Sequence, residues 1–105
     1  IHEGYPVTYN NPTLTMNMLP TLERVAGSKH VSESELTTGA EDFSFYALET
    51  PGLFVFLGIT PPGQNAAEAP SNHSPHFYAD EDALKTGTEL YINWVFDYPK
   101  VANTQ

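Results

Sequence analysis

The first helical pattern along the chain lies close to its N-terminus. Apolar side chains recur at three- and four-residue spacing between Leu14 and Val25, as they do on one face of an α-helix. Asn11 and Pro12 suit the N-cap and the first helical position, and Gly27 suits the end. Pro20 lies inside the pattern and removes a backbone hydrogen bond. We therefore expect two short helical pieces on either side of it.

Two more helices are predicted downstream. Residues 41–48 begin with two acidic side chains, which the helix dipole favours in a first turn, and Pro51 follows as a breaker. Residues 80–98 give the strongest helical pattern, with Asp80 placed to cap and apolar residues at helical spacing as far as Tyr98. Pro99 is expected to end this helix.

The segments between these helices have the character of strands. Residues 53–57 are apolar without interruption, which is typical of a strand covered on both faces in an α/β sheet. Residues 5–9 are β-prone and suit an edge, and residues 31–36 could form a short peripheral strand. The alternation of helices and strands predicts the α/β class.

Composition narrows the function classes. The chain has 105 residues and a formal charge of −9, which argues against binding to nucleic acid or to an anionic membrane surface. It has no cysteine, so disulfides, thiolate metal ligands and cysteine nucleophiles are excluded. No apolar run approaches the ~20 residues that cross a bilayer. We expect a cytoplasmic protein, with a periplasmic or secreted location as the alternative.

Candidate chemistry is concentrated at residues 72–76, which end a loop of about a dozen residues. His73 follows a predicted buried strand and precedes a capped helix, which is where ligands gather in open α/β sheets. Spacing alone leaves two readings, a metal ligand or a loop histidine bonded to backbone. We expect His76 to be a surface residue without a metal-binding role. His2 and His30 lie in polar sequence and are expected to have no role in a site.

A second candidate segment begins at Gly39, which permits a tight turn of the kind that presents backbone N–H groups to anions. Glu41 and Asp42 could serve as a general acid and base, or could simply favour the start of a helix. Adjacent helical residues do not face each other, which favours the second reading.

Taken together, these segments resemble a known family. The blocks are TGAEDFSFY at residues 38–46, PGLFVFLG at 51–58, HSPHF at 73–77 and DEDAL at 80–84. Their order resembles the C-terminal part of the metal-dependent amidohydrolases, which include hippurate hydrolases, N-acyl-amino-acid amidohydrolases and auxin-conjugate hydrolases. The opening GYPVTYN at residues 4–10 resembles the family's return from its small lid domain.

The resemblance implies a fold and a division of the chain. Residues 1–9 would be the end of the lid, or dimerisation, domain and the re-entry strand. Residues 10–105 would be the C-terminal portion of a zinc-exopeptidase-like catalytic domain, with a twisted mixed sheet flanked by helices. The first residue is not Met, so we expect the chain to be a C-terminal fragment of a longer hydrolase.

The resemblance also implies a site. His73 would be a ligand of a two-metal centre holding Zn, Mn, Ni or Co, and the substrate side would be lined by Gly39, Ala40, Glu41, Asp42 and Phe43. The catalytic base and the other ligands belong to N-terminal motifs of the family that have no counterpart here, so no catalytic residue is assigned within this chain.

The expected parent protein hydrolyses the amide bond of N-acyl amino acids, peptides or related conjugates, and its lid would allow a homodimer. The 105 residues alone are expected to bind metal weakly and to be inactive. The alternative is a stand-alone, non-catalytic α/β binding domain, or one half of a two-chain assembly.

Overall fold

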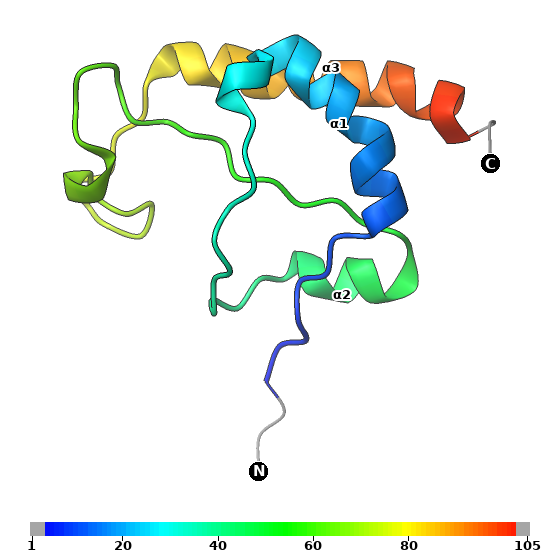
Figure 1. Ribbon diagram of the computed structural model, residues 1–105. Helices are drawn as coiled ribbons and strands as arrows, with labels where there is room; N and C mark the ends of the chain where they lie inside the picture. The colour runs from blue at the N-terminus through cyan, green and yellow to red at the C-terminus, as the bar shows by residue number, and fades with distance from the viewer. Residues whose placement is uncertain (1–3, 103–105) are drawn as a thin grey trace.

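The computed structural model describes residues 4–102, and all of its regular elements are helical (Figure 1). Three α-helices and two single-turn 3-10 helices are joined by long extended connections. Their bounds in chain order are α1 Pro12–Ala26, η1 Ser28–His30, α2 Phe43–Glu49, η2 Ala66–Glu68 and α3 Glu81–Ala102.

Helix α1 begins and ends as its sequence predicts, but it is not broken in the middle. The Asn11 side chain accepts a hydrogen bond from the Leu14 backbone N–H at 2.9 Å, and Gly27 follows the helix with a φ of 88°. The prediction of two pieces around Pro20 is wrong, because α1 continues through it. The fixed φ of proline is compatible with a helix. The buried side of α1 includes Thr21 and Leu22, directly after the proline, so packing holds the turn.

Helices α2 and α3 differ from the prediction at one end each. Helix α2 starts at Phe43 instead of Glu41, since the Glu41 side chain accepts a hydrogen bond from the Phe43 N–H at 3.1 Å. Asp80 caps α3 as predicted, accepting from the Asp82 N–H at 3.0 Å. The predicted end at Pro99 is wrong, because α3 runs on to Ala102. A proline so near the end removes only one hydrogen bond of a 22-residue helix.

The predicted α/β class, with its twisted mixed sheet, is wrong for residues 4–102, where no strand is present. Residues 5–9, 31–36 and 53–57 are extended, but they form no ladder of backbone hydrogen bonds with another segment. A strand requires a neighbour with which it exchanges backbone hydrogen bonds. Just beyond residues 5–9 and just before residues 53–57, the Asn11 N–H donates one backbone hydrogen bond to the Gly52 carbonyl at 2.9 Å. An apolar, extended sequence is therefore not sufficient to form a sheet here.

The packed interior lies between α1 and α3, the two helices drawn side by side in Figure 1. Met18 and Leu22 of α1 and Leu90 of α3 are its buried apolar residues. At its edge the Thr21 hydroxyl donates to the Asp97 carboxylate at 2.8 Å, and Arg24 pairs with the same carboxylate. A small apolar contact and one polar cluster thus join the two helices.

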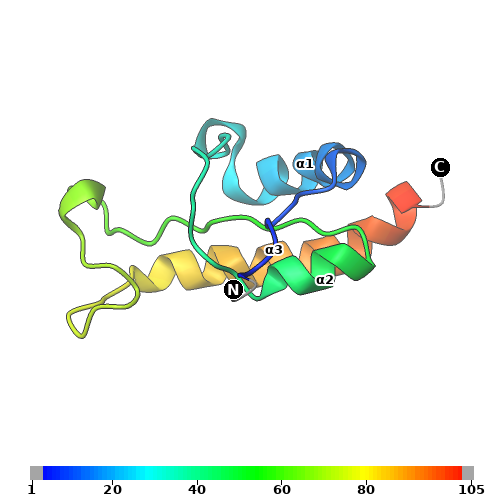
Figure 2. The same cartoon turned by 90° about the horizontal axis from the view of Figure 1, so that it is seen from below.

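The molecule is a flat layer, which is seen by comparing Figures 1 and 2. Its principal extents are 45 × 44 × 20 Å and its radius of gyration is 15.6 Å. A compact domain of this length would have a radius of gyration of about 13 Å. Helix α2 lies apart from the α1–α3 pair at the end of extended segments (Figure 1). Within the described range no helix is long and apolar enough to cross a membrane.

Candidate functional site

The loop that carries His73 projects beyond the N-terminal end of α3, in green to yellow in Figure 1. Its two ends are tied together, because the Asp80 N–H donates to the Ile59 carbonyl at 2.8 Å. Inside the loop, the Tyr78 hydroxyl donates to the Gln64 side chain, and Gly63 adopts a φ of 81° that disfavours other residues. The ends of the loop are therefore held together, and contacts inside the loop help to fix its conformation.

Two successive serine turns present the two histidines. The Ser71 hydroxyl accepts from the His73 N–H, and the Ser74 hydroxyl accepts from the His76 N–H, both at 3.1 Å. The Ser74 N–H also donates to the Ser71 carbonyl at 2.9 Å. Serine side chains commonly stabilise turns in this way. Each histidine therefore has its backbone fixed by the serine two positions before it.

His73 and His76 are both exposed, so either imidazole is accessible to a ligand. A histidine nitrogen is a good ligand for zinc and related metals. Among the described residues, however, no group of three or more histidine, aspartate or glutamate side chains could hold a metal ion. His73 therefore offers a single imidazole, and the described residues gather no group of three or more possible metal ligands around it.

The predicted substrate segment, residues 39–43, is an open stretch that leads into α2. Gly39 and Ala40 are exposed, and Glu41 is half-buried. The Glu41 carboxylate accepts from the Phe43 N–H, and its carbonyl accepts from the Ser44 N–H at 3.1 Å. These contacts agree with a role for Glu41 in starting the helix.

Asp42 is held from a distant part of the chain. The Tyr5 hydroxyl donates a hydrogen bond to the Asp42 carboxylate, and this bond, together with the negative charge, raises the pKa of Tyr5 above its ordinary value. The Tyr5 ring also meets the Phe45 ring edge-on, with centroids 5.4 Å apart. The N-terminal segment therefore contacts the predicted substrate segment through both a polar and an aromatic interaction.

Phe43 anchors the same segment to residues 52–54. Its ring centroid lies 5.6 Å from that of Phe54. A Cβ added to Gly52 would approach the Phe43 ring to 3.0 Å, so the absence of a side chain there allows the ring to lie against the backbone. The Phe43 ring is therefore occupied by packing, and within residues 39–43 the exposed positions are Gly39, Ala40 and Asp42.

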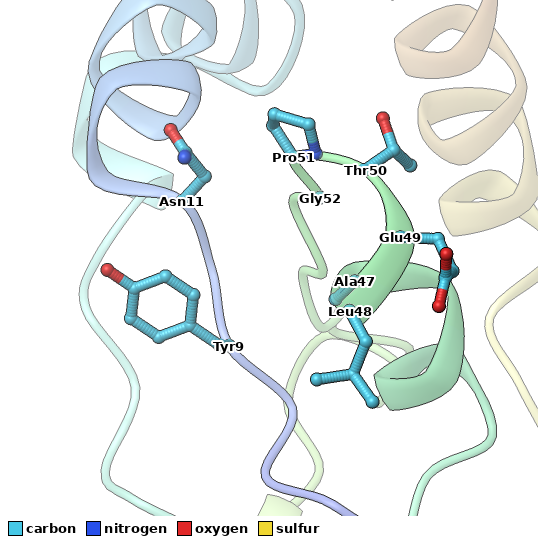
Figure 3. A pocket seen from close by; sticks show the side chains of 8 residues that line it. All are labelled: Tyr9, Asn11, Ala47, Leu48, Glu49, Thr50, Pro51 and Gly52. Atoms are coloured by element: carbon cyan, nitrogen blue, oxygen red, sulfur yellow. The ribbon is translucent and has the colours of Figure 1, made fainter.

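The two predicted parts of the site do not meet within residues 4–102. In Figures 1 and 2 the loop of residues 60–79 and the segment before α2 lie in different parts of the molecule. A shallow pocket of about 220 Å³ lies elsewhere, between the N-terminal segment and the end of α2 (Figure 3). None of the predicted site residues lines this pocket. Its lining consists of Tyr9, Asn11, Ala47, Leu48, Glu49, Thr50, Pro51 and Gly52.

Two features of the site were missed by the sequence reasoning. The paired turns are visible in the sequence as a repeated Ser-x-His, at Ser71–His73 and at Ser74–His76. The contact of Tyr5 with Asp42 carries no local signal, because it joins residues far apart in the chain.

Comparison with known proteins identifies a family. The model of peptidase family M20/M25/M40 matches residues 1–97. Thermostable carboxypeptidase 2 of Saccharolobus solfataricus is 41% identical over 87 residues, covering 83% of this chain and 21% of that protein. The putative amidohydrolase YhaA of Bacillus subtilis is 29% identical over 96 residues, covering 91% and 24%.

A plant relative agrees with these two. IAA-amino acid hydrolase ILR1-like 6 of Arabidopsis thaliana is 33% identical over 87 residues, covering 83% of this chain and 18% of that protein. The chain thus spans about a fifth of the length of the curated relatives it matches. No solved structure matches it significantly. With a family model that matches almost its whole length, this chain belongs to peptidase family M20/M25/M40.

Proposed function

We propose that this chain forms part of a two-metal hydrolase that cleaves the amide bond of N-acyl amino acids or related conjugates. The observation that carries the proposal is His73, an exposed imidazole whose backbone is fixed by Ser71, in a chain of this family. The names of the matched relatives, which include a putative amidohydrolase, an IAA-amino acid hydrolase and a carboxypeptidase, support amide or peptide hydrolysis as the reaction class.

In this proposal His73 supplies one metal ligand, and the remaining ligands and the general base come from polypeptide outside these 105 residues. When bound, paired divalent metals would polarise the scissile carbonyl and activate a water molecule. Of the candidate metals zinc, manganese, nickel and cobalt, zinc and nickel suit an imidazole ligand, whereas manganese prefers oxygen donors, which the other ligands would have to supply. The serine turn at Ser71 would restrict the direction from which His73 approaches the metal.

Residues 39–43 lie on the substrate side in this proposal. Gly39 and Ala40 leave their backbone groups accessible, and such groups suit the carboxylate of an amino-acid substrate. Asp42 is restrained by Tyr5, and Phe43 is packed against Phe54, so the segment has anchors on both sides. Because residues 39–43 and His73 lie apart within the described structure, substrate and metal would meet only when other polypeptide completes the site.

The test uses the longest natural polypeptide that contains this chain and compares His73→Ala with His76→Ala. The two residues share exposure and a serine turn, which makes them a matched pair. We expect His73→Ala to lower hydrolysis of N-acyl amino acids by about 100-fold or more and to reduce metal content, while His76→Ala has a mild effect. The reverse pattern would assign the ligand to His76. Full activity and metal content in both variants would show that neither histidine is a metal ligand, whereas no hydrolysis by the unmodified polypeptide would favour the non-catalytic binding domain.

A further inference from the structure

The loop that presents His73 is held at its base by the start of α3. The Asp80 N–H donates to the Ile59 carbonyl at 2.8 Å, and the Asp80 side chain accepts from the Asp82 N–H at 3.0 Å. One residue therefore closes the loop and caps the helix. The base of the loop is thereby fixed to α3, which shares the packed interior with α1.

Above this base, the side chains of Tyr78 and Gln64 join the two arms of the loop. The Tyr78 hydroxyl donates to Oε1 of Gln64, a residue 14 positions earlier in the chain. Joining two such distant points restricts the conformations that are open to the residues between them. The enclosed segment, green to yellow in Figure 1, contains η2, both serine turns and His73.

Gln64 is a suitable anchor because its own arm is built from local turns. Its backbone N–H donates to the Pro61 carbonyl at 3.2 Å, across a turn in which Gly63 has a φ of 81°. Directly after it, the Asn65 side chain accepts from the Ala67 N–H at 3.1 Å and starts η2. The backbone of Gln64 is therefore restrained on both sides.

The other side of the bond is a short unit of consecutive turns. Residues 71–77 form two turns that share Ser74. The Ser74 N–H donates to the Ser71 carbonyl at 2.9 Å, and the Ser74 carbonyl accepts from the Phe77 N–H at 3.1 Å. Tyr78 follows this unit directly. The place where the Tyr78 side chain is held therefore sets the orientation of the unit, including the histidine at its centre.

Such a restraint matters for a metal ligand. A ligand nitrogen has to lie within about 0.2 Å of its ideal distance from the metal. Loops are more mobile than the elements that they connect, and both His73 and Tyr78 are exposed, so burial holds neither of them. The hydrogen bonds of the loop are therefore needed to limit its motion.

We propose that Tyr78 is a positioning residue for His73. By donating to Gln64, the Tyr78 hydroxyl holds the two serine turns in the orientation from which the imidazole meets a divalent metal. Tyr78 contacts neither metal nor substrate in this role. The role rests on the proposed function, in which His73 is a metal ligand, and it makes metal affinity depend on a residue that is not a ligand.

The first measurement uses the 105-residue chain without metal and compares Tyr78→Phe with Tyr98→Phe. Both changes remove one hydroxyl from an exposed tyrosine, but Tyr98 lies near the opposite end of α3. Backbone order parameters from NMR relaxation report the motion of each residue. In Tyr78→Phe the order parameters of residues 71–77 should fall from about 0.85, typical of rigid backbone, toward about 0.6, while those of α1 and α3 stay unchanged. Tyr98→Phe should leave the loop as it is.

The second measurement determines zinc affinity in the longest natural polypeptide that contains this chain, by competition with a chromophoric chelator. Tyr78→Phe should weaken zinc binding by about three- to tenfold, the range that one net hydrogen bond supplies. Gln64→Leu removes the acceptor and should have the same effect. Gln64→Glu should stay within about twofold of the unmodified protein, since a carboxylate accepts the same hydrogen bond. The double variant Tyr78→Phe/Gln64→Leu should bind no more weakly than either single variant, because both remove one shared bond.

His73→Ala separates failure of the positioning role from failure of the proposed function. If His73→Ala lowers zinc affinity and Tyr78→Phe does not, the metal ligand is correct and the positioning role is wrong. If His73→Ala leaves zinc affinity unchanged, the proposed function fails and the positioning role fails with it. The positioning role is also overturned if the loop stays rigid in Tyr78→Phe, if α1 and α3 loosen together with it, or if the losses of the two single variants add.

Discussion

The side-chain amide of Asn10 forms a pair of hydrogen bonds with the backbone of Phe54. Its oxygen accepts from the Phe54 N–H at 2.7 Å, and its nitrogen donates to the Phe54 carbonyl at 2.8 Å. The amide thus takes the place that a neighbouring strand would occupy. With the Asn11 N–H bonded to the Gly52 carbonyl, it fixes the extended residues 52–54 beside the N-terminal segment.

Replacement of Asn10 tests how much this pairing stabilises the fold. Asn10→Ala removes both bonds, each worth about 0.5–1.5 kcal/mol, and should lower the free energy of unfolding by about 1–2 kcal/mol in total, because the site is exposed to competing water. Asn10→Asp keeps the acceptor and loses the donor, so a smaller loss is expected. Urea denaturation followed by circular dichroism measures both. Equal stability of Asn10→Ala and the unmodified chain would show that the pairing contributes nothing.

The starts of α1 and α3 were predictable because their signals are local. Asn11 with Pro12, and Asp80 with the acids after it, cap α1 and α3 as the sequence indicates. The effects of Pro20 and Pro99 were not predictable in the same way, because tertiary packing and position near a helix end decide whether a proline interrupts the helix. Both helices continue through their prolines.

The sheet could not be judged from residues 53–57 alone. An apolar run shows that a segment is to be buried, whereas a ladder depends on a second segment elsewhere in the chain. Here that neighbour is the side chain of Asn10, which no periodicity reveals. In the candidate site, too, some features have a local signal in the sequence and others do not. The serine turns before His73 and His76 are local, and the contact of Tyr5 with Asp42 is not.

Asp97 should make the stability of the chain depend on pH in acid. Hydrogen bonds from Lys100 and Thr21, and then from Arg24, lower the pKa of Asp97 to about 2, from an ordinary value of 3.8. Above the ordinary value the carboxylate is charged in both the folded and unfolded states, and its contribution is complete. As the pH falls from about 4 to about 2 the unfolded state takes up the proton first, so stability is lost.

Asp97→Asn should remove this component, and the loss of stability between about pH 4 and pH 2 should become shallower. Asp82→Asn is the matched control. Asp82 also accepts from a lysine three residues away, but its side chain is 83% exposed, compared with 19% for Asp97. Thermal unfolding at several pH values compares the three proteins. An acid slope that Asp97→Asn leaves unchanged would assign the effect to other carboxylates.

Two buried hydroxyls should respond in opposite ways to removal. Ser44 is completely buried, and its hydroxyl has no hydrogen-bond partner among the described residues. Thr21 is also buried, but its hydroxyl donates to Asp97. Ser44→Ala should therefore leave stability unchanged or raise it by up to about 1 kcal/mol, whereas Thr21→Val should cost about 1–2 kcal/mol. Chemical denaturation distinguishes them. A large loss in Ser44→Ala would mean that its hydroxyl has a partner in solution.

The 105-residue chain on its own should bind zinc or manganese weakly and should not hydrolyse N-acyl amino acids. His73 offers one imidazole, and the described residues bring no group of three ligands together, whereas a metal held by the protein alone needs several donors. Calorimetry should show no tight stoichiometric binding, and an assay with a hippurate substrate should give no turnover above buffer.

His73→Ala and His76→Ala serve as controls, because any weak binding by an exposed imidazole should fall in at least one of them. Tight one-to-one or two-to-one binding, or clear turnover by the unmodified chain, would contradict the proposal that the remaining ligands lie outside it. A metal site completed by self-association would be recognised by binding that rises with protein concentration, since each copy would then contribute its own His73 to a shared centre.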